Sequence, residues 1–194
     1  MNKHIIIIEG YLASGKSTFA RLLSSGLNVP YLIKDTFKEA LCTSVSINSR
    51  AESSQFSAIT FDAMMYVVER FMETGHPIII EGNFVPAGVK DIDESDRIMK
   101  LINRYSYKSL VFKFVGDTQV LHERFVKREK SPERGKANTM FSEVLYHDFD
   151  TWCRSLDGFN IDEEIIKIDT TDFTKIDYTH YIEKARLFMS GEAK

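Results

Sequence analysis

One short segment combines glycines, a lysine and a serine at a spacing that suits phosphate binding. Residues 10–17 read Gly-Tyr-Leu-Ala-Ser-Gly-Lys-Ser, which matches the phosphate-binding loop (P-loop) pattern G-x-x-x-x-G-K-S/T in full. The glycines let the backbone form a concave loop whose N–H groups converge on a phosphate. Lys16 then reaches the outer phosphates as a point charge, and the Ser17 hydroxyl can ligate Mg²⁺. The candidate contacts to a nucleotide are Gly10, Leu12, Ala13, Ser14, Gly15, Lys16, Ser17 and Thr18.

The segments on either side of the P-loop predict a strand and a helix that would hold it. Before the loop, residues 4–9 form a short apolar run rich in isoleucine, typical of a strand buried on both faces. After it, Phe19, Leu22 and Leu23 fall at helical spacing, and Gly26 is expected to end that helix. The order strand, loop, helix directs the loop amides and the positive helix end at one anion. This order disfavours the alternative, a glycine-rich turn without chemical importance.

Two acids follow later predicted strands. Asp35 comes directly after the second strand, and Glu81 ends the third and is followed by Gly82 and Asn83. Because ligands of open parallel sheets bind beyond the carboxyl ends of the strands, both acids are expected beside the P-loop. Gly82 would let a ligand approach the backbone closely. The structural alternatives are that Asp35 caps the helix beginning near Thr36 and that Glu81 merely ends its strand.

Four arginines are candidates for holding anions. Arg124 and Arg128 stand four residues apart on one predicted helix, so both guanidinium groups project on the same side. Arg134 follows in a charged segment interrupted by proline and glycine. The interleaved glutamates leave open the alternative of ordinary surface ion pairs. Arg50, near the start of a long predicted helix, could bind an anionic substrate group, and the alternative is a solvent-facing arginine.

Strand and helix patterns alternate along the whole chain. This alternation predicts an α/β three-layer sandwich, in which a mostly parallel sheet of about five strands is covered by helices on both sides. The strands are expected at residues 4–9, 30–33, 77–81, 109–115 and 164–168.

Helical spacing also predicts which residues face the core. One long helix is expected to end at Gly75, and a later helix to be capped by Asp117, with Leu121 and Phe125 facing inward. A further helix through Tyr105 has a cap-like start at Asp91 and Glu94. The apolar stripe of the long helix is Phe56, Ile59, Ala63, Met64, Val67, Val68 and Phe71.

The composition of the chain limits the class of protein it can be. A chain of 194 residues that is 43% hydrophobic and 27% charged fits one folded domain, and its net charge of −3 gives no overall attraction to nucleic acid or anionic membrane. The first apolar run is too short to cross a bilayer or to act as a signal peptide. Cys42, Cys153 and the scattered histidines show no metal spacing. We therefore expect a cytoplasmic protein with reduced thiols and no membrane partner.

The P-loop, its flanking elements and the two acids together resemble the P-loop small-molecule kinases. This superfamily includes relatives of gluconate kinase, shikimate kinase, chloramphenicol phosphotransferase and the zeta-toxin sugar kinases. The resemblance spans nearly the whole chain, although the P-loop is its only specific motif. It implies the nucleotide-kinase type of P-loop NTPase fold, with ATP and Mg²⁺ as cofactors. It also implies a single domain over residues 1–194 with a mobile lid at about 127–138.

The same resemblance assigns expected roles to the candidate residues. Asp35 would orient the acceptor hydroxyl and accept its proton. Glu81 would hold Mg²⁺, through water or directly, or would position the acceptor. The arginines of the lid would contact the transferring phosphoryl group, with Arg124 as the first choice before Arg128 and Arg134. Residues 169–172 would surround the adenine.

The sequence thus predicts a kinase that moves the γ-phosphoryl group of ATP to a hydroxyl of a small metabolite, an antibiotic or a nucleotide sugar. One alternative acceptor is a nucleotide or a polynucleotide 5′-hydroxyl. The acidic balance and the lack of a basic stripe with aromatic residues disfavour a long nucleic acid. A further alternative is a slow, nucleotide-bound switch protein. The acceptor, the choice between ATP and GTP and the oligomeric state are left open by the sequence.

Overall fold

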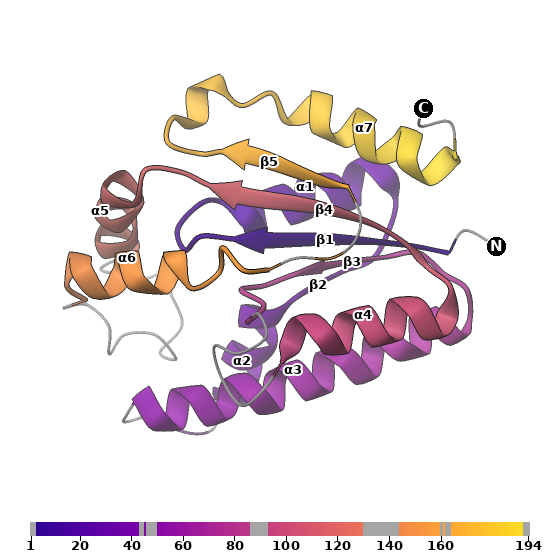
Figure 1. Ribbon diagram of the computed structural model, residues 1–194, viewed down its shortest axis with the longest axis horizontal. Coiled ribbons are helices and arrows are strands. Elements are labelled where there is room, and N and C mark those ends of the chain that lie inside the picture. Colours follow the sequence, from indigo (N-terminus) through magenta and orange to yellow (C-terminus); the bar gives the residue numbers. More distant parts are fainter. Residues whose placement is uncertain are drawn as a thin grey trace.

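The computed structural model describes residues 3–42, 45, 50–85, 93–129, 144–159, 161 and 164–191. Its centre is one sheet in the strand order β2-β3-β1-β4-β5 (Figure 1). All four neighbouring pairs are parallel, which confirms the expected fold class. The strands are β1 (His4–Gly10), β2 (Tyr31–Ile33), β3 (Ile78–Glu81), β4 (Lys108–Val115) and β5 (Ile165–Asp169).

Helices cover both faces of the sheet. In Figure 1, α1 and α7 lie on one face and α3 and α4 on the other, while α5 and α6 stand at the carboxyl ends of the strands. Within the described part of the chain, no helix is both long and apolar enough to span a membrane. The helices are α1 (Lys16–Leu27), α2 (Lys34–Cys42), α3 (Arg50–Glu73), α4 (Glu94–Tyr105), α5 (Thr118–Glu129), α6 (Tyr146–Arg154) and α7 (Tyr178–Ser190), with a 3₁₀ turn at Phe173–Lys175.

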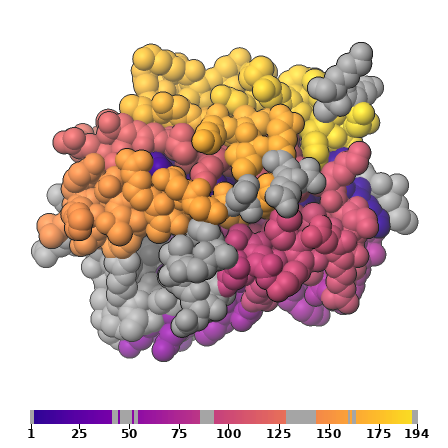
Figure 2. Space-filling model, in the orientation of Figure 1, coloured from indigo at the N-terminus to yellow at the C-terminus, as the bar shows by residue number. Residues whose placement is uncertain are grey.

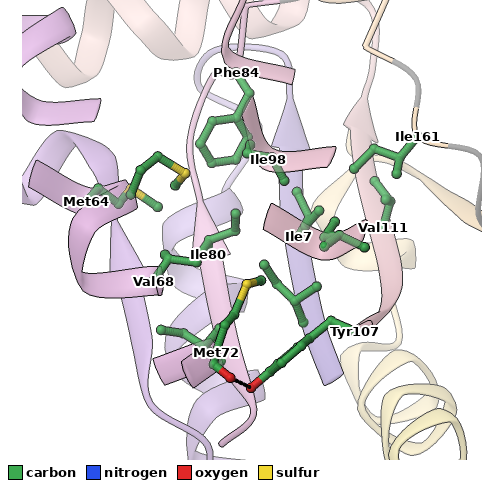
Figure 3. Packing of buried hydrophobic residues seen from close by; sticks show 14 of the residues in the cluster. Ile7, Met64, Val68, Met72, Ile80, Phe84, Ile98, Tyr107, Val111 and Ile161 are labelled. Carbon is green, nitrogen blue, oxygen red and sulfur yellow. Dashed lines mark hydrogen bonds between the residues drawn. The ribbon is translucent and has the colours of Figure 1, made fainter. Parts of the chain in front are cut away.

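The isoleucine run of β1 divides between two hydrophobic clusters. Ile5 and Ile7 pack with α3 and α4, whereas Ile6 and Ile8 pack with α1 and α7. Figure 3 shows the first cluster, in which Ile7 lies among side chains from α3, α4 and β4. Successive side chains of a strand point to opposite faces, so a strand with helices on both sides needs apolar residues throughout. This burial fixes the end of β1, and therefore the start of the P-loop, at the middle of the sheet.

The expected end of the first helix was wrong. Gly26 lies inside α1, which continues to Leu27 and ends at Asn28 in the left-handed conformation (φ 55°). A Cβ atom at Gly26 would lie 2.8 Å from Cγ2 of Ile182 in α7. Gly26 is therefore needed for the close approach of α7 to α1, a tertiary requirement that helix-stop rules do not include.

The apolar stripe expected for α3 was only partly correct. Met64 and Val68 are buried as expected, but Ile59 is 52% exposed. Apolar residues occur around most of the circumference of α3, so spacing alone did not select the face that packs on the sheet. The face that is buried consists of Thr60, Phe61, Met64, Met65, Val68 and Met72.

Helix caps agree better with the sequence. The Asp117 carboxylate accepts hydrogen bonds from the backbone N–H groups of Gln119 and Val120, and Leu121 and Phe125 are buried. Gly75 follows α3 with a positive φ of 71°. The start of α4 differs, because its N-cap is Asp93, which accepts from the Asp96 N–H. Asp91 lies outside the described residues.

Candidate active site

Both P-loop glycines meet requirements that no other residue satisfies easily. Gly10 has a φ of 122°, and a Cβ atom there would lie 2.1 Å from the carbonyl oxygen of Phe114. Gly15 has a φ of 85° and is the N-cap of α1. Glycine alone adopts these conformations without strain. The loop thus turns back over the end of β4 and enters α1 with its amides at the helix N-terminus, where anions are favoured.

Two side chains of the loop donate hydrogen bonds to carbonyls of the loop itself. The Ser14 hydroxyl donates to the Tyr11 carbonyl at 2.6 Å. The Lys16 ammonium donates to the carbonyls of Gly10 at 2.9 Å and Tyr11 at 2.7 Å. Lys16 is only 7% exposed, and this burial lowers its pKa, an effect that the nearby carboxylate of Glu81 opposes. Lys16 must therefore break its hydrogen bonds to the two backbone carbonyls before its ammonium can contact a phosphate.

A cleft with a volume of about 110 Å³ opens above the loop. It joins residues from four places in the sequence: the P-loop, the start of α2, the end of β3 and the end of α5. The candidate residues whose side chains the structure describes lie in it, except Gly10, Arg124 and the expected adenine contacts at 169–172. The lining residues are Leu12, Ala13, Ser14, Gly15, Lys16, Ser17, Thr18, Asp35, Glu81, Gly82, Asn83 and Arg128.

Ser17 and Glu81 are in direct contact. The Ser17 hydroxyl donates to Oε2 of Glu81 at 2.9 Å. Glu81 is 4% exposed, and burial raises its pKa to about 7, although the Lys16 charge acts in the opposite direction. A hydroxyl and a carboxylate side by side suit Mg²⁺, which prefers oxygen ligands and takes most of its shell from water and phosphate. Within the described residues no group of three or more histidine, cysteine or acidic side chains forms a metal cage, so such an ion would depend on a bound phosphate.

Asp35 lies in the first turn of α2 and is exposed to the cleft. Because α2 begins at Lys34, Asp35 is inside the helix and is not its N-cap. A carboxylate in the first helical turn is still favoured by the helix dipole. The structure therefore leaves the Asp35 carboxylate available to a ligand while its position also suits the helix.

A buried ion pair connects the segments that carry Asp35 and Glu81. The Lys34 ammonium donates to both oxygens of Glu94, at 2.5 and 2.7 Å. Glu94, the first residue of α4, also accepts the backbone N–H of Val85 at 3.0 Å. Both charged side chains are buried, so the charge of Lys34 is neutralised by Glu94 and is not offered to the cleft. The pair holds the start of α2 and the loop after β3 in a fixed relation.

Arg124 and Arg128, expected to act together, have different surroundings. Arg128 lines the cleft. Arg124 is not among the described residues that line the cleft. Its guanidinium donates to the carbonyls of Thr170 and Thr171, the latter at 2.6 Å. It also lies 4.1 Å from the ring centroid of Phe173. The Phe173 ring is 3.1 Å from the position of a Cβ atom on Gly15. Arg124 and Phe173 thus form a wall beside the P-loop, in the region where the sequence predicted adenine contacts.

Two predicted arginines cannot be placed. The side chain of Arg50 and all of Arg134 lie outside the described residues, as do residues 130–138 of the expected lid.

The comparisons with known proteins agree with this geometry. Residues 5–145, well over half of the chain, match the AAA_33 family, described as an AAA domain. The chain belongs to this AAA domain family. No curated protein matches the chain.

Several solved structures share the fold of this AAA domain. One is a protein inferred to be a kinase, from Chloroflexus aurantiacus J-10-fl, with 22% identity, 99% of this chain and 98% of that chain covered, and a TM-score of 0.79. A gluconokinase from Sinorhizobium meliloti 1021 has 13% identity, 98% and 93% coverage and a TM-score of 0.55. A shikimate kinase from Bacteroides thetaiotaomicron has 15% identity, 96% and 98% coverage and a TM-score of 0.55. These similarities show that the chain shares the fold of these proteins, which is the fold that the sequence resemblance implied.

Sequence reasoning did not single out one acid of this AAA domain. Glu9, directly before the P-loop, is fully buried, and its carboxylate lies 3.4 Å from the Lys113 ammonium on β4. Burial raises the pKa of Glu9 to about 7, against the opposing charges of Lys113 and Lys16. The available signal was an acid at the end of an otherwise apolar run, since a buried strand carries an ionisable residue only when a partner is close.

Proposed function

We propose that the protein is a kinase that uses ATP and Mg²⁺ to phosphorylate a hydroxyl group of a small molecule. The observation that carries the proposal is the single cleft that holds the P-loop, the Ser17–Glu81 pair and Asp35. Phosphoryl transfer needs an anion cradle, a metal ligand and a group beside the acceptor, and these three features meet there. The structural neighbours named as gluconokinase and shikimate kinase support the same reaction class.

The residues of the P-loop would bind the triphosphate. The amides of residues 12–18 and the Lys16 ammonium would hold the β- and γ-phosphates once Lys16 exchanges the carbonyls of Gly10 and Tyr11 for phosphate oxygens. Ser17 and Glu81 would hold Mg²⁺, which when bound neutralises the charge that develops between the β- and γ-phosphates. Burial opposes the ionised form of Glu81 and a bound cation would favour it, so nucleotide and metal should bind together.

Asp35 would act on the acceptor hydroxyl. Its carboxylate faces the cleft and would align the attacking hydroxyl and accept its proton, an assistance of about 10²–10⁴-fold. Gly82 and Asn83 line the neighbouring wall and would contact the rest of the acceptor. Its chemical class within this proposal is a small metabolite, an antibiotic or a nucleotide sugar, and the proposal places the reaction in the cytoplasm, where ATP is available.

Arg128 and Arg124 would bind different parts of the nucleotide. Arg128, in the cleft, would stabilise the charge of the transferring phosphoryl group. Arg124, stacked against Phe173 beside Gly15, would instead contact the nucleobase together with residues 169–172. This assignment replaces the first choice made from the sequence. Arg134 in the lid and Arg50 near the acceptor keep their proposed roles in binding phosphate and an anionic group.

Turnover and binding by single variants test the proposal. ATP affinity is measured by calorimetry with Mg²⁺, and ATP consumption is measured in the presence of a metabolite extract. Lys16→Ala should lose turnover. Asp35→Asn should keep ATP affinity and lose roughly 10²–10⁴-fold in kcat. Asp62→Asn is the matched control, because Asp62 is an exposed acid that pairs with Arg97 on α4. An unchanged kcat in Asp35→Asn would remove Asp35 from the mechanism, and an absence of ATP binding would reject the proposal.

A further inference from the structure

The second residue of the P-loop is bound to a turn that is distant in sequence. The turn follows α6 and consists of residues 155–158. The Tyr11 hydroxyl donates to Oδ1 of Asp157 at 2.8 Å, and Nη1 of Arg154 lies 3.4 Å from the same hydroxyl. Tyr11 is 4% exposed. Burial and the bond to Asp157 raise the pKa of Tyr11 to about 12, so its hydroxyl remains a donor at neutral pH.

The third P-loop residue is tied to the same region. Leu12 packs against the hydrophobic cluster around Cys153, which lies near the end of α6. Cys153 is fully buried, and burial raises the pKa of its thiol to about 11. It belongs to a hydrophobic cluster that also contains Tyr11, Phe125 and Phe149. A neutral, buried thiol in this cluster packs as a small apolar group and does not act as a nucleophile.

The turn itself is fixed to the sheet. The Lys113 ammonium donates to the carbonyls of Leu156 at 3.1 Å and Asp157 at 3.0 Å. Lys113 and Glu9 are opposite each other in the register of β4 and β1, and their charged groups are 3.4 Å apart. Figure 2 shows α6 and the turn as one strip of the surface between α5 and α4. The 155–158 turn is therefore bound to the sheet through Lys113 and to the P-loop through Tyr11.

We propose that the 155–158 turn is a support that keeps the P-loop open for phosphate, and that Tyr11 is the positioning residue through which it acts. The carbonyl of Tyr11 accepts from both Ser14 and Lys16, so the place of Tyr11 decides where the Lys16 ammonium rests. Holding the loop in one conformation before binding reduces the entropy that nucleotide binding must overcome. This inference rests on the proposed function, since it concerns nucleotide affinity.

A tyrosine-to-phenylalanine pair of variants tests the inference. Tyr11→Phe removes only the hydroxyl and should weaken Mg²⁺–ATP binding by roughly 3- to 10-fold, the usual net effect of losing one hydrogen bond. Tyr105→Phe is the matched control, because its hydroxyl donates to Glu69 at 2.9 Å between α4 and α3. Asp157→Ala should reproduce the loss, and Asp157→Asn, which keeps Oδ1, should restore most of the affinity. Thermal unfolding of all variants separates a loss of affinity from a loss of fold.

A second measurement does not need nucleotide. Hydrogen exchange of the amides in residues 11–14 should be faster in Tyr11→Phe than in the wild type and unchanged in Tyr105→Phe. Wild-type exchange in Tyr11→Phe, or an equal loss of ATP affinity in both variants, would overturn the inference and leave the proposed function intact. A wild-type protein that binds no ATP would instead reject the proposed function, while the exchange result would still decide whether the turn supports the loop.

Discussion

The Ser17 hydroxyl donates to the Glu81 carboxylate at 2.9 Å, which links the start of α1 to the end of β3. These residues belong to two sequence patterns that are far apart in the chain, and the parallel pairing of β1 with β3 brings them together. Their contact supplies two adjacent oxygen donors next to the P-loop amides, so it is the part of the cleft most directly related to a metal–nucleotide complex.

Glu81→Gln should weaken the response to Mg²⁺. The substitution keeps the size of the side chain and an oxygen near Ser17 but removes the charge, so half-maximal ATP turnover should need roughly 10- to 100-fold more Mg²⁺. Titration of the metal at fixed ATP measures this shift. The control is Glu69→Gln, which changes an acid bound to Tyr105 and Arg104 away from the cleft. An identical Mg²⁺ titration for Glu81→Gln and the wild type would exclude Glu81 from the metal site.

Glu9 should make the stability of the fold depend on pH. Its carboxyl keeps a proton up to about pH 7 when folded, whereas the unfolded chain releases it near 4.5. The folded state therefore binds more protons between these values, and the free energy of unfolding must fall as pH rises through this window. From about pH 5 to about pH 8 the wild type should lose about 2–3 kcal/mol relative to Glu9→Gln.

Urea unfolding at several pH values measures this difference. Glu183→Gln is the control, because Glu183 is an exposed acid that pairs with Arg186 on α7. A difference between the wild type and Glu9→Gln that stays constant with pH would show that the Glu9 carboxyl is ionised throughout.

The Lys34–Glu94 pair should contribute to both stability and acceptor positioning. Lys34→Met leaves the Glu94 charge buried without its cation, which typically destabilises a fold by about 3–5 kcal/mol. Lys34→Met combined with Glu94→Gln should recover part of the stability, because no unpaired charge remains. We expect turnover to stay low in the double variant, since Asp35 and the loop after β3 are no longer held together.

Denaturant unfolding and ATP turnover, measured on the same samples, test whether stability recovers while turnover stays low. Lys100→Met, which disrupts an exposed pair with Asp96, should leave both quantities unchanged. Full turnover in the double variant would show that the pair has no role in positioning Asp35.

The two arginines of α5 should affect different measurements. Arg124→Ala should lower ATP affinity by roughly tenfold, because it removes the cation stacked on Phe173, and should leave the affinity for tripolyphosphate unchanged. Arg128→Ala should lower kcat with a smaller effect on ATP affinity. Calorimetry with both ligands and steady-state kinetics distinguish the two roles. Equal losses of ATP and tripolyphosphate affinity in Arg124→Ala would place Arg124 on phosphate, as the sequence alone suggested.

The fold and the P-loop could be predicted from the sequence because their signals are local. The isoleucine run of β1 predicts a strand that is buried on both faces, and the two glycines of the P-loop predict a backbone with positive φ angles. The convergence of Asp35 and Glu81 followed from a general property of parallel sheets. These predictions needed no knowledge of which side chains meet.

The remaining features depend on contacts between distant segments. Gly26 looked like a helix stop, yet its role is set by Ile182 of α7. Arg124 looked equivalent to Arg128, and only the position of the loop after β5 shows that it binds the carbonyls of Thr170 and Thr171. Cys153 has no local pattern that would place it beneath the P-loop. Such contacts are tertiary, and a single sequence contains no periodicity that reports them.

Transfer of a labelled phosphoryl group tests the central claim most directly. The protein is incubated with Mg²⁺, a metabolite extract and ATP that carries ¹⁸O in its γ-phosphate, and the products are identified by mass spectrometry. The account predicts a phosphomonoester that carries the γ label and is absent with Lys16→Ala. Bound ATP that yields only labelled inorganic phosphate, or no labelled product, would contradict a kinase acting on a hydroxyl group.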